Sequence, residues 1–486
     1  MIKSIQQFLT AGTTELSKTM EFFAEDPKKF AEMVYGVTKS VTELGVSIIA
    51  EELESWDELI RNSNTRKQLW YIVRKDETTL LTSLGSVTYQ KTLFKNKKDG
   101  HCEYLLDKYM GLESHERITE DAVAKLLEEA VESSYRKGGD RACLTDESVS
   151  KECVMNKIHE LEFPSTKNFP EKKQVQYLYI DADEDHVALQ FQDHKGEKKE
   201  KGKRQSVMPR LVYLYEGISD EDGRNELVNP TYFGGLYGEE TGGAKALWRE
   251  VESFIQRNYD TDQLKAVYIN GDGASWIKSG EEYITHGRFV LDKYHMHKYI
   301  IKATGHLKDD VQKARSDLYH AIAKKDRNLV IAVFDAISNA SPEDKQDTIN
   351  NSRGYILGNW AGIKRQVRSK DTQLKCSAEG HVSHVYSDRM SSRPLGWCRT
   401  GVDKMARLRI YRANHGNMLE LVRYQKQELK KAAGAEYDEI GLSAGQIIEM
   451  QNRQKAALGV LEGTKIYTVP LQVKKILAIS DHLLGL

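Results

Sequence analysis

The sequence predicts an α/β core that carries an all-helical insertion and is flanked by mostly helical regions. Five segments are rich in β-branched and aromatic residues and are expected to be strands: residues 175–191, 209–215, 228–237, 265–270 and 288–291. A helix with one apolar face, residues 244–258, separates the third strand from the fourth. The order of three strands, a helix, a strand, a helix and a strand is the one expected of an RNase H-like sheet with helices on its faces.

Residues 294–370, which follow the last of these strands, have a helical pattern throughout. The segment Ser341-Pro342-Glu343-Asp344 is a typical helix start, with an N-cap, a proline at the first position and acidic residues near the positive end of the helix dipole. We therefore expect this block to be a helical insertion in the α/β domain.

The region ahead of the core is expected to be helical at residues 1–74, because apolar residues recur there at helical spacing among charged ones. Residues 78–94 change to β-branched residues around Gly85 and lead into the basic turn KNKKDG, which indicates a hairpin. Residues 119–136 return to a helical pattern with one apolar stripe.

Residues 133–161 are expected to form a helix, a short turn and another helix. Ser150, whose hydroxyl can satisfy an amide at the helix start, is the N-cap expected for the second helix. Its apolar residues, at helical spacing, are Val154, Ile158 and Leu161. Lys151, Asn156 and Lys157 would then point outward, as in the recognition helix of a helix-turn-helix that enters the major groove of DNA. An ordinary corner between two helices fits the same pattern.

These elements divide the chain into six regions. They are an N-terminal helical and hairpin region (1–115), a helix-turn-helix (116–163), the first part of the α/β core (171–300), the helical insertion (301–371), the last part of the core (372–410) and a helical C-terminal region (411–486).

The composition is that of a globular protein, with 40% hydrophobic and 29% charged residues among 486. No apolar run is long enough to span a bilayer, and the N-terminus lacks a signal-peptide pattern, so we expect a cytoplasmic protein with no membrane partner. The five scattered cysteines include no C-x-x-C pair and are expected to be reduced thiols. The net charge of -1 gives no global sign of nucleic-acid binding, which would have to depend on local basic patches.

Carboxylates lie near the ends of predicted strands. Asp181, Asp183 and Asp185 alternate and so lie on one face of the first strand. Asp272 follows a buried strand between two glycines, and Glu379 follows the helical block. Each one alone also fits a turn or a helix cap.

Phosphodiester chemistry explains why three such carboxylates would be brought together. Two Mg²⁺ or Mn²⁺ ions about 4 Å apart activate an attacking hydroxyl and stabilise the leaving oxygen. These ions prefer carboxylate oxygens as ligands. His381 and His384 would suit zinc, but no matching Cys or His pair accompanies them.

Four stretches carry a more specific resemblance: YLYIDADEDHVALQ, YINGDGASWIK, FVLDKYHMHKYI and SAEGHVSHVYSDRMSSRPLGW. They resemble the motifs of the ISLre-type bacterial insertion-sequence transposases, a family similar to the Mutator-like DDE transposases, and the resemblance covers nearly the whole chain. It implies an RNase H-like fold, a helical insertion before the final Glu, and divalent-metal-dependent DNA cleavage and strand transfer at terminal inverted repeats.

The resemblance also implies roles for individual residues. Asp272 matches the second acid of the triad and Glu379 the third. Asp183, with Val187 four positions later, matches the first acid, and Asp181 is the alternative. Asp292 and His295 resemble the family's Asp-x-x-His motif, whose expected role is to support the active site or the DNA without binding the metal directly. A histidine that only forms hydrogen bonds at the start of a helix fits the placement of His295 equally well.

Basic side chains near these acids are expected to hold the DNA backbone. The candidates are His381, Arg389, Arg393, Arg399, Arg407 and the lysine-rich stretch 195–204, which also fits a solvated loop. Trp276 and Trp397 would stack on an unpaired base or belong to the core. The partners expected are double-stranded DNA and, because two element ends must be held together, a second copy of the chain in a homodimer or higher oligomer. A nuclease with the same core and a non-catalytic DNA-binding protein remain the alternatives.

Overall fold

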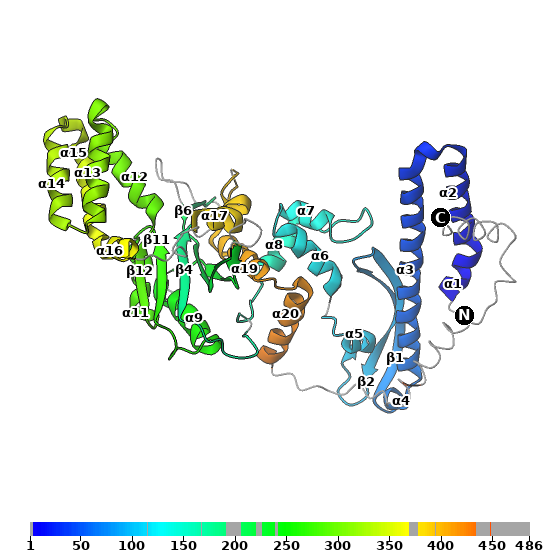
Figure 1. Ribbon diagram of the computed structural model, residues 1–486. Coiled ribbons are helices and arrows are strands. Elements are labelled where there is room, and N and C mark those ends of the chain that lie inside the picture. Colours follow the sequence, from blue (N-terminus) through cyan, green and yellow to red (C-terminus); the bar gives the residue numbers. More distant parts are fainter. Residues whose placement is uncertain are drawn as a thin grey trace. The chain divides into compact units, whose positions relative to one another are not determined.

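The structure is a computed structural model that describes residues 3–113, 115–166, 168–190, 206–219, 226–238, 242–368, 378–393, 395–433 and 448. The chain folds into two compact units (Figure 1). The first comprises residues 1–154 and 418–486, and the second comprises residues 155–417. The second unit is therefore inserted in the sequence of the first.

The first unit begins with helices. They are α1 (Lys3–Gln7), the π-helical turn η1 (Phe8–Gly12), α2 (Thr13–Glu25), the 3-10 turn η2 (Pro27–Lys29), α3 (Phe30–Asn62) and α4 (Asn64–Leu69). The backbone N–H groups of Lys3 and Ser4 donate to the Glu51 carboxylate at 2.7 Å, which ties α1 to α3. Helix was expected as far as residue 74, but a strand starts at Trp70, because the aromatic and β-branched run 70–73 favours extended structure.

An antiparallel sheet in the order β1-β2-β3 follows these helices. Its strands are β1 (Trp70–Leu81), β2 (Ser86–Asn96) and β3 (Cys102–Glu103), so the expected hairpin is present and longer than predicted. Helix α3 packs on β2, and the buried side chains of this region include Ile60, Val87 and Phe94. The short helix α5 (Leu105–Met110) adds Leu105 and Leu106 to the same core.

Four helices complete the first unit: α6 (Glu120–Ala130), α7 (Tyr135–Asp140), the start of α8 (Lys151–His159) and α20 (Met418–Ala433). The single helix expected at 119–136 is interrupted, because Ser134 Oγ accepts from Lys137 N at 3.3 Å and so starts α7. Ser150 Oγ accepts from Cys153 N at 3.2 Å, as predicted for an N-cap. The predicted inward stripe of α8 is also confirmed, since Val154, Ile158 and Leu161 are all buried.

The second unit is built on a mixed five-stranded sheet in the order β10-β7-β4-β11-β12. The strands are β4 (Tyr177–Glu184), β7 (Arg210–Tyr215), β10 (Thr231–Gly235), β11 (Ala266–Gly271) and β12 (Gly287–Leu291). Strands β4, β11 and β12 are parallel, whereas β7 and β10 are antiparallel to their neighbours. Two short strand pairs, β5 (Val187–Ala188) with β6 (Ser206–Val207) and β8 (Gly217–Ser219) with β9 (Glu226–Val228), lie outside this sheet.

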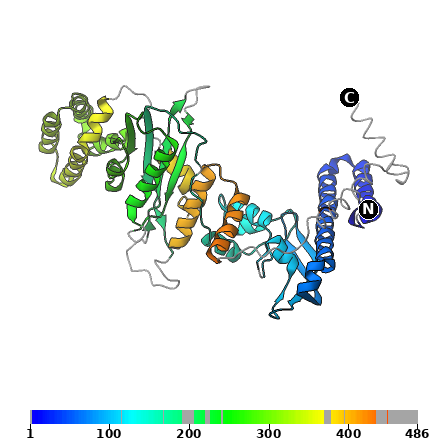
Figure 2. The same cartoon turned by 90° about the horizontal axis from the view of Figure 1, so that it is seen from below.

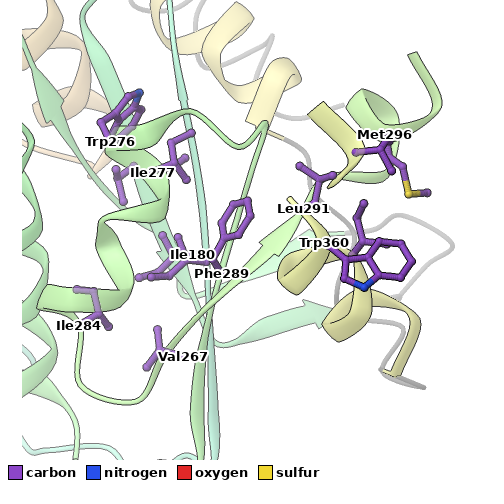
Figure 3. Close-up of a cluster of buried hydrophobic side chains, with 14 of the residues drawn as sticks. Ile180, Val267, Trp276, Ile277, Ile284, Phe289, Leu291, Met296 and Trp360 are labelled. Carbon is purple, nitrogen blue, oxygen red and sulfur yellow. The ribbon is translucent and has the colours of Figure 1, made fainter. Parts of the chain in front are cut away.

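The two faces of this sheet differ in chemistry because side chains alternate along each strand. One face is apolar and packs against α9 (Gly243–Asn258), α10 (Ser275–Lys278) and α11 (Gly280–Tyr283). Figure 3 shows part of this core, where Ile180 and Phe289 from two of the strands lie close together and Val267 from a third lies on the side of Ile284. The other face of β4 presents tyrosines and aspartates, and the rings of Tyr179 and Tyr215 stack at 5.5 Å.

Helical segments after residue 378 lie against the sheet. They are α17 (Ala378–Val382), the π-helical turn η7 (Ser383–Ser387), α18 (Asp388–Met390) and α19 (Arg399–Ala413). Helix α17 packs on β4, and α19 packs along β10, beside the sheet in Figure 2. Leu236 N donates to Asp403 Oδ1 at 2.9 Å, which fixes α19 to the end of β10.

The helical block expected after the last strand is present. It comprises α12 (Lys293–Thr304), η5 (Lys308–Asp310), α13 (Val311–Ala323), α14 (Arg327–Asn339), η6 (Glu343–Lys345), α15 (Gln346–Gly358) and α16 (Trp360–Arg368). Its buried side chains continue the core of the sheet, and Met296 and Trp360 lie near Leu291 in Figure 3. In the part of the chain that the structure describes, no helix is long and apolar enough to cross a membrane.

Candidate active site

Two carboxylates meet at one edge of the central sheet. Strands β4 and β11 are parallel neighbours, so their carboxyl ends lie together. Asp183 is near the end of β4, and Asp272 directly follows β11. Burial and, to a smaller extent, the negative charge of Asp272 raise the pKa of Asp183 to about 6, although Glu184 N donates to Asp183 Oδ1 at 2.8 Å. The two acids therefore form an electrostatically coupled pair.

Asp181 has a different environment from Asp183, which lies two residues later on the same face. It is fully buried, whereas Asp183 is only partly buried. Its carboxylate accepts hydrogen bonds from Tyr213 OH at 2.8 Å, Tyr215 OH at 3.3 Å and Asn270 Nδ2 at 2.7 Å. Asp181 is thus an internal acceptor that holds three strands together, and Asp183 is the carboxylate that lies beside Asp272.

The loop that carries Asp272 is fixed on several sides. Ala274 N donates to Asp272 Oδ1 at 2.8 Å, and Tyr355 OH donates to the Asp272 carbonyl oxygen. Gly273 has φ +89, and a Cβ there would lie 2.5 Å from Asn359 Oδ1, so the turn requires glycine. The helical block therefore holds this loop in place through α15 and the residue that follows it.

Asp292 and His295 lie next to the acid pair. Asp292 N donates to Gly271 O at 2.9 Å, and the Asp292 side chain accepts from Tyr294 N at 3.0 Å and so caps α12. His295 Nδ1 lies 2.9 Å from Asp292 Oδ2. That hydrogen bond raises the pKa of His295 against the effect of burial, and the charges of Asp292, Asp272 and Asp183 raise it further. A protonated His295 would partly neutralise the two acids.

Glu379 lies on α17, the helix that packs on β4, and its side chain is exposed. His381 on the same helix fixes its position, since the His381 and Tyr213 rings are 4.3 Å apart and His381 Nδ1 lies 3.1 Å from Tyr232 OH. Burial lowers the pKa of His381. The fold thus brings the helix that carries Glu379 to the strand that carries Asp183.

The three acids do not form a closed ligand set. Within the described residues, no group of three or more His, Cys, Asp or Glu side chains is arranged to hold a metal ion. Asp183 and Asp272 are nevertheless suitable oxygen donors, because their mutual repulsion is relieved when a cation binds between them. Glu379, which the sequence analysis expected as a third ligand, is exposed on α17 and is not grouped with the pair in such an arrangement among the described residues.

The segment that carries Glu379 is anchored to the sheet at several points. Ser391 Oγ donates to both Asp185 oxygens at 3.0 and 2.8 Å, and Tyr386 OH donates to Arg210 O at 3.0 Å. Arg409 of α19 donates to the carbonyl oxygens of His384 and Val385 in the π-helical turn. These bonds satisfy carbonyl groups that the turn frees from ordinary helical pairing.

The basic and aromatic residues expected to contact DNA fall into different classes. Arg389 is buried, with its guanidinium 5.0 Å from the centre of the Trp397 ring, and Arg407 Nε pairs with Asp403 Oδ1 at 3.0 Å. Trp276 and Trp397 are both buried. The exposed residues of this set are Arg393, Arg399, Lys151 and Asn156, whereas Lys157 is partly buried. Residues 195–204 lie outside the described residues.

Helix α12 carries a basic surface that the sequence analysis missed. Its exposed side chains are Lys293, Tyr294, His297, Lys298, Ile301 and Lys302, and residues 293–304 contain no acidic residue. The helix starts at Asp292, directly beside the acid pair. The signal in the sequence was a helical segment at residues 293–304 with three lysines and no carboxylate, beginning at the Asp-x-x-His pair.

The fold and site together define a mixed α/β protein with a pair of acids at the carboxyl ends of two central parallel strands. The chain belongs to the family described as "Uncharacterised protein family (UPF0236)", whose model matches residues 24–428.

Similar proteins occur in several copies in one bacterium. A UPF0236 protein of Caldanaerobacter subterraneus subsp. tengcongensis, whose name combines eleven locus labels, is 38% identical over 411 residues, which is 84% of this chain and 83% of the relative. A second from that organism is 39% identical over 392 residues, 80% of each chain. A UPF0236 protein from Streptococcus gallolyticus is 24% identical and covers 81% of this chain and 84% of its own.

Among solved structures, the Drosophila P element transposase strand transfer complex matches 74% of this chain and 90% of that chain. The sequence identity is 9% and the TM-score is 0.22. A TM-score this low does not establish a shared fold.

Proposed function

We propose that this protein is the DNA transposase of an insertion sequence, of the ISLre type and related to Mutator-like DDE transposases. The observation that carries the proposal is the pair of acids, Asp183 and Asp272, at the ends of β4 and β11. The sheet order β10-β7-β4-β11-β12, with an antiparallel half and a parallel half, is the order expected of an RNase H-like core and supports the same proposal.

In this proposal Asp183, Asp272 and Glu379 hold Mg²⁺ or Mn²⁺, with two ions expected. Bound there, such ions would supply charge to activate an attacking hydroxyl and to stabilise a leaving oxygen. Asp183 is preferred over Asp181 as the first acid, because three hydrogen bonds already engage the buried Asp181 carboxylate. Asp292 and His295 hold the end of β11 and balance the charge of the pair. Glu379 would move toward the pair when metal and DNA bind.

The distribution of the relatives supports a mobile element. The name of one relative combines eleven locus labels of a single bacterium, and another combines four. A gene that copies or moves itself within a genome produces such repetition. Double-stranded DNA, carrying terminal inverted repeats or serving as target, is accordingly the proposed partner.

The proposed DNA contacts are polar and basic side chains in both units. Helix α12 begins beside the acids, and its exposed Lys293, Lys298 and Lys302 suit the DNA that is being cut. Lys151, Asn156 and Lys157 on α8 are the proposed contacts for recognising the element ends, and Arg393 is a further phosphate contact. Arg389 and His381 are proposed instead to support the site from within, because packing against Trp397 and Tyr213 engages them.

The test is strand cleavage and joining on DNA that carries the element's own ends. We expect joining by the wild-type protein with Mg²⁺ or Mn²⁺ and none with EDTA. Asp272→Asn and Glu379→Gln should lower joining at least ~100-fold, as loss of a metal ligand does, while DNA binding persists. Asp262→Asn, an exposed residue ahead of β11, is the matched control and should retain activity.

Other outcomes would change the assignment. Metal-dependent cleavage without joining would favour a nuclease with the same core. DNA binding by a well-folded protein with no chemistry in either metal would favour a non-catalytic DNA-binding protein and would contradict the proposal.

A further inference from the structure

Strand β1 is an open edge of the sheet in the first unit. The sheet order is β1-β2-β3, and no other strand among the described residues pairs with the outer side of β1 before Leu81. Helix α3 packs on β2 and leaves β1 exposed. Such an edge is a template for pairing with another chain, and proteins usually protect it.

The edge carries exposed apolar side chains in addition to open backbone groups. Tyr71 is 60% exposed, Ile72 43% and Val73 46%, and the preceding Leu69 is 52% exposed. Four large apolar residues within five positions is an unusual surface for a strand that faces water. This composition indicates that β1 is covered in the functional protein.

The backbone groups that face outward can be assigned from Leu81. Its N–H donates to Arg117 O at 2.8 Å, and its carbonyl accepts from Thr119 N at 2.9 Å, so both groups point away from β2. Because orientation alternates along a strand, the N–H and C=O groups of Thr79, Glu77 and Lys75 also point outward. Among the described residues no backbone group pairs with them, so they form a row of donors and acceptors at the open edge.

We propose that this edge pairs with the same strand of a second copy of the chain, antiparallel and about a two-fold axis at Asp76. Residues 117–119 cover the edge from Leu81 onward, so the open stretch of β1 runs from Trp70 to Leu80, with a bulge between Ile72 and Arg74. An axis at Asp76 is the one that brings oppositely charged side chains of the two strands together. A two-fold axis perpendicular to the sheet keeps each face continuous, and an isologous contact of this kind closes as a dimer.

The charges along β1 are self-complementary in this register. Lys75 lies opposite the partner's Glu77, and Glu77 lies opposite the partner's Lys75, with both pairs on one face. These residues have the outward backbone groups, so each oppositely charged pair also exchanges two backbone hydrogen bonds. Centring the axis on Lys75 would instead place Lys75 opposite its own copy and Arg74 opposite the partner's Asp76, although Arg74 and Asp76 already pair within each copy.

In this register Asp76 lies opposite the partner's Asp76, and hydrogen bonds within each copy reduce the repulsion between the two carboxylates. Asp76 Oδ1 accepts from Arg74 Nε at 2.9 Å, and Asp76 Oδ2 accepts from Tyr104 OH at 2.7 Å. Its negative charge is thus partly neutralised within each copy before the two strands meet.

The experiment compares charge reversals in the full-length chain by analytical ultracentrifugation. The wild type should form a dimer. Lys75→Glu and Glu77→Lys each replace two attractive pairs by two repulsive ones, so each should raise the dimer dissociation constant on the order of tenfold or more. The double variant Lys75→Glu/Glu77→Lys restores the complementarity and should recover dimerisation. Lys98→Glu, in the turn between β2 and β3, is the matched control.

Circular dichroism checks that each variant is folded, and the exposed positions of Lys75 and Glu77 make unfolding of the variants unexpected. A wild type that stays monomeric at all concentrations tested would overturn the proposal. So would single variants that dimerise as well as the wild type. The single variants could also lose the dimer while the double variant fails to recover it. That result would mean that β1 contacts something other than β1 of a second copy, and it would also overturn self-pairing.

Discussion

At the scale of single residues, Asp183 determines how the candidate site responds to pH. Its folded pKa is about 6, above the ordinary value of 3.8, so the folded protein retains this proton over a pH range in which the unfolded chain has lost it. Metal-free protein should therefore lose stability as pH rises from about 4 to about 6, by roughly 3 kcal/mol from this group alone. A bound divalent cation should reverse this loss of stability, because the cation binds the ionised form of the Asp183 carboxylate.

The measurement is urea unfolding of wild type and Asp183→Asn between pH 4.5 and 7.5. The difference in free energy of unfolding between the two proteins should grow in favour of the variant as pH rises, and Mn²⁺ should stabilise the wild type more at pH 7.5 than at pH 5. The exposed Asp262→Asn serves as control. An identical pH dependence in wild type and Asp183→Asn would show that Asp183 does not hold a raised pKa.

The sequence predicted which carboxylates share a face but not how each is used. Alternation along β4 placed Asp181 and Asp183 together, and that depends only on strand geometry. The burial of Asp181 depends on Tyr213 and Tyr215, which come from an antiparallel neighbour about thirty positions later, and no local pattern contains that register. Arg389 illustrates the same limit, since its burial against Trp397 depends on a long-range arrangement.

At the scale of elements, α12 joins the acid site to a basic surface. Its first residues follow Asp292, and its exposed side chains include Lys298 and Lys302. Lys298→Glu/Lys302→Glu should weaken DNA binding at least ~10-fold at low salt and reduce the dependence of affinity on salt, because two phosphate contacts are lost. Fluorescence anisotropy across a salt series without metal measures both effects.

The matched control for α12 is Lys265→Glu. Lys265 is exposed just before β11, at the opposite end of that strand from Asp272. Equal losses in the control and the α12 variant would indicate a general effect of net charge, and α12 would then not be a DNA contact.

Elements were easier to predict than their ends. The five strands and α9 were recognisable because each has a distinct apolar period and defined flanking turns. The end of the N-terminal helices was misplaced, because the short apolar run 70–73 is followed by the charged run 74–77, and this pattern fits a helix or an exposed edge strand equally well. The boundary between α6 and α7 was misplaced for a similar reason, since the cap at Ser134 lies within a sequence that still has helical spacing.

At the scale of the whole molecule, the chain leaves the first unit after Val154 and returns to it at Met418. Helix α20 therefore completes the first unit from the far end of the sequence. Leu421 is fully buried, and Lys426 Nζ pairs with Glu120 Oε1 at 3.1 Å and Glu116 Oε2 at 3.4 Å. The second unit has its own core around the five-stranded sheet, so the two units are expected to lose structure separately.

Two cavity-forming substitutions test this separation. Leu421→Ala should cost about 2–5 kcal/mol in the first unit, and Leu318→Ala, fully buried in α13, should cost a similar amount in the second. Hydrogen exchange should accelerate in α6 for the first variant and in β12 for the second. Acceleration of both segments in both variants would instead identify a single cooperative unit. If the prediction holds, Leu421→Ala should also leave the Mn²⁺ affinity of the acid pair unchanged, because Asp183 and Asp272 depend on the second core alone.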